Sequence, residues 1–145
     1  MRVALIVCIV AASVSACGKN AVAPSEVLGA MNVAGTWNGT IGSSNNATEQ
    51  LKMVLTQSGS TVSGSWDSSS VSWAGQVSGA VSGSSFNGQF TFSGTAANGT
   101  VCTGTANVVG SATASTMTLT SASGVIGGSC PAPLPTGLKM DVQRQ

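Results

Sequence analysis

Apolar and polar residues alternate along most of the chain from residue 33 onward. The clearest case is the segment FNGQFTF, in which Phe86, Phe90 and Phe92 fall on one face and polar residues on the other. Successive side chains of a β-strand point to opposite faces of a sheet, so a period of two predicts strands with one buried and one solvated face. No segment shows a convincing helical period. The chain is therefore expected to be all-β.

Eight segments carry this pattern, and short stretches rich in glycine and serine separate most of them. They are residues 33–41, 49–57, 61–67, 73–81, 86–92, 100–109, 115–121 and 138–143. Eight antiparallel strands joined in sequence can close into a barrel, and closure removes exposed sheet edges. We predict an eight-stranded antiparallel up-and-down β-barrel, with a β-sandwich as the alternative. Segments 43–48, 68–72 and 122–128 are expected to be loops that could carry function.

Aromatic residues and glycines share the faces that the alternation directs inward. The candidates for the barrel interior are Trp37, Trp66, Trp73, Phe86, Phe90 and Phe92. The glycines on the same faces are Gly35, Gly39, Gly64, Gly75, Gly79 and Gly88. An eight-stranded barrel is just wide enough for side chains to fill it. Glycine beside large rings would let the rings lie flat against the backbone and give a filled core, although it could instead leave a ligand cavity.

Residues 1–16 have the features of a secretory signal peptide. Arg2 precedes the apolar run VALIVCIVAA, which is about half as long as a membrane-spanning helix requires. The following residues, VSAC at 14–17, resemble the bacterial lipobox, in which a branched apolar residue and two small ones precede an invariant cysteine. This resemblance implies cleavage before Cys17 and attachment of acyl chains such as palmitate to that residue. The alternative is an ordinary signal peptide in which Cys17 is incidental.

The expected organisation follows from this N-terminal segment. A signal peptide at 1–16 would precede a flexible tether at 17–32 that begins with the lipidated Cys17, and the β-barrel domain would cover 33–145. In lipoprotein sorting, aspartate after the cysteine is the familiar signal for retention in the inner membrane. Gly18 occupies that position, so the resemblance favours the outer membrane. We expect a protein of the cell envelope, on its periplasmic or surface face, whose membrane partner is reached through Cys17.

The remaining cysteines agree with export. Cys8 lies in the signal peptide and Cys17 would carry lipid, which leaves Cys102 and Cys130 as an even pair. We predict a disulfide between them, because exported proteins fold in an oxidising compartment. Such a bond would contribute about 3–4 kcal/mol in the loop-entropy model. The alternative is two free thiols.

Charge and composition argue against several functions. Charged residues make up 6% of the chain, and without Arg2 the basic and acidic residues balance, so nucleic-acid binding is not expected. The chain has no histidine, and two cysteines alone do not make a zinc site, so we expect no metal and no cofactor. A serine nucleophile would lack its usual base. The alternation places the lysines and carboxylates on outer faces or in the tether. We therefore expect no enzyme.

The Gly35-Thr36-Trp37 sequence at the start of the first strand, followed by a β-meander, resembles the avidin and lipocalin barrels from residue 33 to the end. In those families the barrel mouth binds a small, largely apolar molecule. A biotin site of the avidin type would need a tyrosine, which this chain lacks, and an inward aspartate on the last strand, whereas Asp141 falls on the polar face. We predict a lipid-anchored envelope protein whose non-enzymatic barrel binds a small apolar ligand or a partner protein. The alternative is a structural envelope lipoprotein with a filled core and no ligand.

Overall fold

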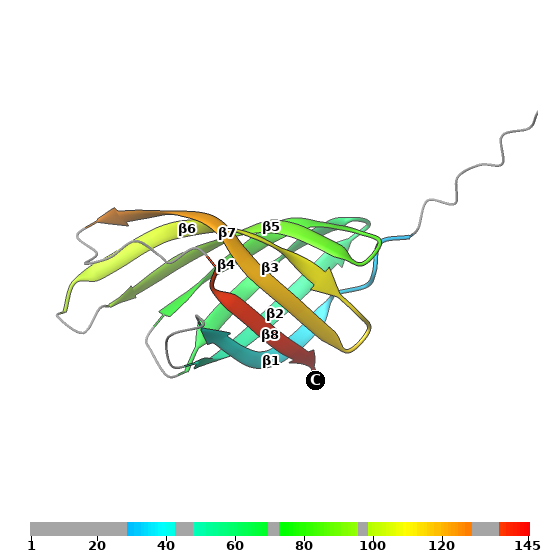
Figure 1. Cartoon of the computed structure of the whole chain (residues 1–145), viewed down its shortest axis with the longest axis horizontal. Helices are drawn as coiled ribbons and strands as arrows, with labels where there is room; N and C mark the ends of the chain where they lie inside the picture. The colour runs from blue at the N-terminus through cyan, green and yellow to red at the C-terminus, as the bar shows by residue number, and fades with distance from the viewer. Residues whose placement is uncertain (1–28, 43–47, 70–72, 96–98, 129–136) are drawn as a thin grey trace, which may run out of the picture.

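The described part of the computed structural model, residues 29–42, 48–69, 73–95, 99–128 and 137–145, is a closed β-barrel (Figure 1). Its strands are β1 (Gly35–Gly42), β2 (Glu49–Ser58), β3 (Thr61–Ser68), β4 (Trp73–Ser82), β5 (Ser85–Thr95), β6 (Val101–Ala112), β7 (Thr116–Gly128) and β8 (Lys139–Arg144). Each strand pairs antiparallel with the next, and β8 pairs with β1. The predicted all-β, eight-stranded up-and-down barrel is confirmed.

Strand β7 is longer than the sequence pattern predicted. Its pairing with β6 joins Asn107 to Ser123 but Val108 to Ser121, so Ala122 is an extra residue on β7. Such a β-bulge shifts the alternation of faces by one residue. The pattern therefore breaks after residue 121, and the expectation that 122–128 is a loop is wrong, because the strand continues to Gly128.

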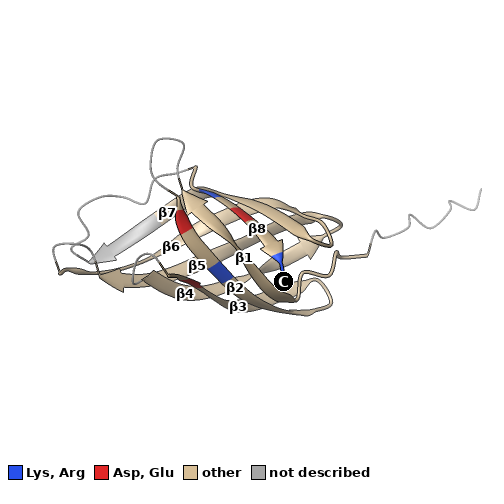
Figure 2. Cartoon of the chain, turned by 90° about the horizontal axis from the view of Figure 1, so that it is seen from below, with Lys and Arg blue, Asp and Glu red and all other residues tan. Residues whose placement is uncertain are grey.

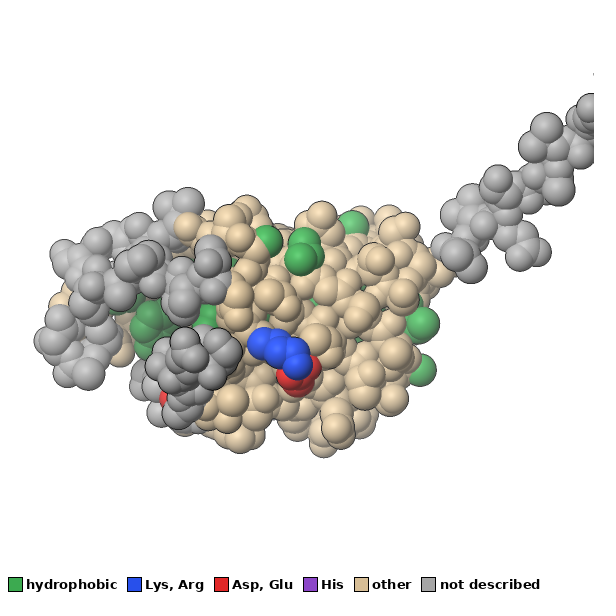
Figure 3. All heavy atoms as spheres, viewed as in Figure 1, with side chains coloured by type: hydrophobic (Ala, Val, Ile, Leu, Met, Phe, Trp, Pro, Cys, Tyr) green, Lys and Arg blue, Asp and Glu red, His purple; other side chains and the backbone are tan. Residues whose placement is uncertain are grey.

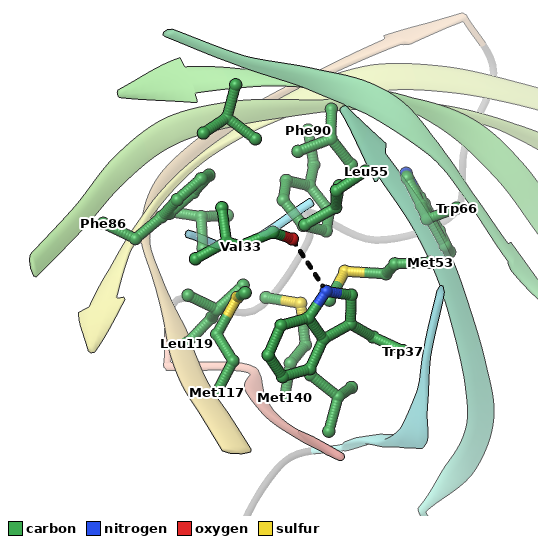
Figure 4. Close-up of a cluster of buried hydrophobic side chains, with 14 of the residues drawn as sticks. Val33, Trp37, Met53, Leu55, Trp66, Phe86, Phe90, Met117, Leu119 and Met140 are labelled. Carbon is green, nitrogen blue, oxygen red and sulfur yellow. Dashed lines mark hydrogen bonds between the residues drawn. The ribbon is translucent and has the colours of Figure 1, made fainter. Parts of the chain in front are cut away.

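A single cluster of buried hydrophobic side chains lies inside the described part of the barrel (Figure 4). Of the aromatic residues, Trp37, Trp66, Phe86, Phe90 and Phe92 are buried, and Trp73 is partly buried against the same cluster. The outward positions of the strands carry mostly serine, threonine, asparagine and glutamine. Figure 3 shows that few hydrophobic or charged side chains reach the face of the barrel in this view. The exposed large hydrophobic residues among those described are Val54, Val101 and Val109.

Glycines make room for one of the buried rings. A β-carbon at Gly79 would lie 2.9 Å from Phe86 Cζ, and one at Gly88 would lie 2.8 Å from the same atom. Gly79 and Gly88 face each other across β4 and β5, so the ring occupies the space that their side chains would take. Gly35 pairs with the buried Leu55 and so shares the face of Trp37 as expected, but it is exposed because it lies at the end of the barrel.

Candidate functional site

The two ends of the barrel are built differently. At the closed end, where β1 begins and β8 ends, turns of two residues, 59–60 and 83–84, connect β2 to β3 and β4 to β5. At the opposite end, here called the open end, longer connections join the strands. These are residues 43–48, 69–72, 96–100 and 129–138. The open end is therefore the part of the fold where sequence can vary without changing the barrel.

The segment that leads into β1 seals the closed end. Val33 and Trp37 are both fully buried, and Trp37 Nε1 donates a hydrogen bond of 2.9 Å to the Val33 carbonyl oxygen (Figure 4). The Gln57 side chain accepts a 2.7 Å bond from Val33 N and donates a 3.1 Å bond to the Met31 carbonyl. Met31 N in turn donates to the Gly83 carbonyl in the turn between β4 and β5. The segment is thus bonded to residues on both sides of this end.

The C-terminal strand completes the seal. The Arg144 guanidinium carbon lies 4.7 Å from the centroid of the Trp37 ring, in the geometry of a cation–π contact. Arg144 Nη2 also donates a hydrogen bond to the Asn32 carbonyl. The following residue, Gln145, donates its backbone N–H to the Thr36 carbonyl at 3.0 Å. The closed end is therefore packed around Trp37, and among its described polar atoms Arg144 Nε is buried without a hydrogen-bond partner.

Aromatic side chains gather towards the open end. Trp73, the first residue of β4, is partly buried and stacks on Phe92 of β5, with ring centroids 5.4 Å apart and an interplanar angle of 18°. Deeper in the barrel, the rings of Trp66 and Phe90 lie 6.2 Å apart at 32°. Trp66 Nε1 donates a 2.8 Å bond to the Thr91 carbonyl, so its polar atom is satisfied. The Trp73–Phe92 pair is consequently the aromatic surface nearest the open end.

A row of cross-strand neighbours passes through Trp73. The pairings join Leu51 to Ser68, Ser68 to Trp73, Trp73 to Gly94 and Gly94 to Cys102. Ser68, at the end of β3, is buried, with a relative exposure of 7%. Within the described part of the chain, its hydroxyl oxygen is buried without a hydrogen-bond partner. Buried polar atoms are nearly always hydrogen-bonded in folded proteins, so this hydroxyl is the feature of the row that needs explanation.

Sequence reasoning placed Ser68 only in an expected loop. The alternation that directs Trp66 inward also directs Ser68 inward, and following it two residues further would have identified the position. The missing hydrogen bond, however, depends on what surrounds the side chain in three dimensions. No sequence pattern reports it.

The predicted cysteine sites are only partly within the described residues. Cys102 is buried on β6, whereas Cys17 and Cys130 lie outside the described ranges. The lipidation of Cys17 and the Cys102–Cys130 disulfide therefore stay predictions. Among the residues described, no group of three His, Cys, Asp or Glu side chains could hold a metal ion. Nor does this part of the chain include a helix long and apolar enough to cross a membrane.

The few charged residues of the barrel lie on different strands and do not gather in one patch (Figure 2). Lys139 Nζ lies 3.0 Å from Asp141 Oδ2, and Thr118 Oγ1 donates to Asp141 Oδ1 at 2.9 Å. The hydrogen bond from Lys139, followed by that from Thr118, lowers the pKa of Asp141 below its ordinary value. Glu49 differs from the others, because it shares the alternation of Leu51 and is half-buried at the open end. Its expected outward placement is therefore wrong.

Comparison of the chain with protein-family models, with curated proteins and with solved structures finds no match. The functional argument therefore depends on the residues of this chain alone.

Proposed function

We propose that this protein is a lipid-anchored component of the bacterial cell envelope whose barrel binds a small apolar ligand at its open end, without catalysis. The contrast between the two ends supports this proposal. The closed end is sealed by Trp37, Arg144 and the segment before β1. The open end instead carries the partly exposed Trp73 stacked on Phe92 and the buried hydroxyl of Ser68. A mainly apolar site with one or two placed polar groups is typical of small-molecule binding.

The position of the tether suits this role. Residues 29–34 lie at the closed end, so a chain anchored at Cys17 reaches the barrel on the side away from the open end. Even fully extended, the chain from Cys17 to Gly29 spans at most about 40 Å. The barrel would sit close to the outer membrane with its open end directed away from the lipid. A ligand or an envelope partner could then reach the open end from the aqueous side.

The absence of histidine from the sequence and the outer positions of Lys52, Asp67 and Asp141 favour binding over catalysis. General acid–base chemistry needs a titratable group placed against the substrate. Glu49 alone among the described acidic residues lies half-buried at the open end, and no described histidine or lysine accompanies it on that face. We therefore assign the open end a binding role.

A structural envelope protein is the second candidate, and the packing of the core favours it. Residues from all eight strands join one buried cluster, in which Trp37, Met53 and Val108 have no exposed surface. A barrel filled in this way needs no ligand for stability. In that case the polar outer surface and the open-end connections would carry any contact with a partner protein.

The lipid anchor is tested by metabolic labelling with a palmitate analogue in a bacterium that expresses the full chain. We expect the wild-type protein to be labelled and to fractionate with the outer membrane, and Cys17→Ser to lose the label because the acceptor thiol is gone. Cys8→Ser is the matched control, since it lies in the same N-terminal segment and should keep the label. Labelling of Cys17→Ser at the wild-type level would contradict the anchor.

The binding role is tested by native mass spectrometry of the protein purified from envelopes in mild detergent, followed by solvent extraction and identification of bound molecules. We expect an apolar molecule of a few hundred daltons at stoichiometric amount. Trp73→Ala should lose it, whereas Val109→Ala, on the outer surface of β6, should retain it. A protein that repeatedly carries no small molecule would favour the structural candidate instead.

A further inference from the structure

We infer that the open end selects an uncharged planar ring that bears one hydrogen-bonding group, and that Ser68 Oγ is the partner of that group. This inference depends on the proposed binding function and names the class of its ligand. It starts from the two serines that are the buried polar residues among those described, Ser68 and Ser121. Ser121 Oγ accepts the Leu138 N–H at 2.9 Å. Ser68 Oγ has no such partner.

An unpaired buried hydroxyl costs folding free energy that a methyl group at the same position would not cost. A serine whose only role was to fill space at the end of β3 would therefore be better replaced by alanine. A hydroxyl can both donate and accept a hydrogen bond, so it can meet a carbonyl, a hydroxyl or a ring nitrogen. Ser68 lies between Leu51 of β2 and Trp73 of β4 in the ladder, so a ligand held against Trp73 would be placed to satisfy the hydroxyl.

The neighbouring aromatic pair determines the shape of that ligand. A β-carbon at Gly94 would lie 2.6 Å from Trp73 Cγ, so the indole lies directly against the backbone of β5. The same indole is stacked nearly parallel to Phe92. Stacked aromatic rings favour a further planar ring over a flexible alkyl chain, because they offer a flat surface.

A charged residue at the same end restricts the ligand further. Glu49 is the acidic residue that the described part of the chain places half-buried at this end, two residues before Leu51. Its carboxylate repels an anionic ligand such as a fatty acid. The other described charged residues of the neighbouring strands, Lys52 and Asp67, are exposed on the outer face. An uncharged ring is the ligand that suits both the stack and the carboxylate.

Access requires a local movement. The Ser68 hydroxyl is buried in the structure, so a ligand reaches it only after a local rearrangement of side chains at this end of the barrel. Trp73 is partly exposed at the first residue of β4 and pairs with Ser68 across the ladder, so a ligand at the hydroxyl would also contact the indole. Binding should therefore alter the fluorescence of Trp73.

The test measures binding of 2-naphthol, naphthalene, 2-naphthoate and 1-decanol to the whole protein after delipidation, by calorimetry and tryptophan fluorescence. We expect the wild-type protein to bind 2-naphthol about five- to ten-fold more tightly than naphthalene, the effect of one hydrogen bond. Ser68→Ala should abolish that preference and leave naphthalene binding unchanged. The charged 2-naphthoate and the flexible 1-decanol should bind more weakly than 2-naphthol.

Thermal unfolding without added probe gives a second readout. Ser68→Ala should raise the melting temperature by a few degrees, because it removes an unpaired buried hydroxyl. Ser121→Ala is the matched control and should lower the melting temperature, because it breaks the bond from Leu138 N. A fall in the melting temperature of Ser68→Ala would show a structural role for the hydroxyl and overturn the inference.

The binding outcomes separate this inference from the function on which it depends. An unchanged preference for 2-naphthol in Ser68→Ala, or tighter binding of 1-decanol or 2-naphthoate, would overturn the ligand class while the binding function stood. If no probe binds, the ligand class is wrong. The extraction experiment on the envelope-purified protein then decides the binding function by itself.

Discussion

At the scale of single residues, Trp66 and Gly75 determine how β3, β4 and β5 pack beside one another. The pairing of β4 with β5 passes from Ala74–Ser93 to Val77–Phe90 and omits Gly75 and Gln76. At this gap the Trp66 indole reaches across β4 to donate to the Thr91 carbonyl, and Thr91 Oγ1 accepts the Gln76 N–H at 3.0 Å. Side-chain hydrogen bonds thus link the strands where these two positions have no registered pair.

This arrangement predicts a specific cost for a methyl group at Gly75. A β-carbon there would lie 1.8 Å from the Thr91 carbonyl oxygen and 2.9 Å from Trp66 Nε1. Gly75→Ala must push β5 away and break the indole bond, so we expect it to lower the free energy of unfolding by about 2–3 kcal/mol. Urea unfolding monitored by circular dichroism measures the change.

Gly29→Ala provides the matched control, because nothing lies within 4 Å of a β-carbon at Gly29. We expect that variant to stay within about 0.5 kcal/mol of wild type. Equal unfolding midpoints for the two variants would show that β5 accommodates the methyl group without cost.

At the scale of elements, β8 is short but fixes the segment before β1. It pairs with β1 along its length, and its last residue, Arg144, covers the Trp37 ring and bonds to Asn32. The first strand and the last therefore hold the closed end together through side chains as well as through the ladder. This contact also determines where the N-terminal tether leaves the barrel.

We predict that Arg144→Ala lowers the free energy of unfolding by about 2 kcal/mol, because it removes a charged hydrogen bond and a cation–π contact. Arg144→Lys keeps the charge but lacks the planar guanidinium, so its loss should be smaller. Thermal unfolding, together with limited proteolysis of the segment before β1, distinguishes the variants. An Arg144→Ala protein as stable and as protease-resistant as wild type would show that Arg144 does not hold the segment before β1 in place.

At the scale of the whole molecule, the sheet closes on itself, and this closure helps a β-protein with few charges to stay folded and unaggregated. The barrel pairs its first and last strands, which removes the exposed edges that would otherwise promote aggregation. Serine, threonine and amide side chains cover the outside, and in places they are hydrogen-bonded across strands, as Thr56 is to Ser63 and Asn107 to Ser123. Neutral groups therefore make up most of the polar surface. Because salt screens mainly charges, the solubility of the protein should respond little to salt concentration.

The predicted Cys102–Cys130 disulfide belongs to this scale, because it would link β6 to the connection before β8. We expect non-reducing peptide mass spectrometry of the exported protein to recover the two cysteines as one linked pair. Reduction should lower the free energy of unfolding by about 3–4 kcal/mol. The double variant Cys102→Ala/Cys130→Ala should match the reduced protein and no longer respond to reductant. Recovery of both cysteines as free thiols would contradict the prediction.

The sequence by itself determined the strands, their order and the composition of the two faces. The alternation of apolar and polar residues is a local property, and a period of two specifies a strand wherever it occurs. It placed Phe86, Phe90 and Phe92 on one face and Lys52 and Asp141 on the other before any strand was paired. It failed where a local rule is interrupted, as at Ala122, whose bulge reverses the faces of β7.

Only the tertiary structure decided which end is sealed and which polar atoms find partners. Arg144 and Asn32 are 112 residues apart, and Trp66 and Thr91 are 25 apart, so neither contact leaves a signal in a local pattern. The unpaired hydroxyl of Ser68 depends on the packing of three strands around it. Periodicity fixes which way a side chain points, whereas its contacts depend on how distant strands are brought together by closure of the barrel.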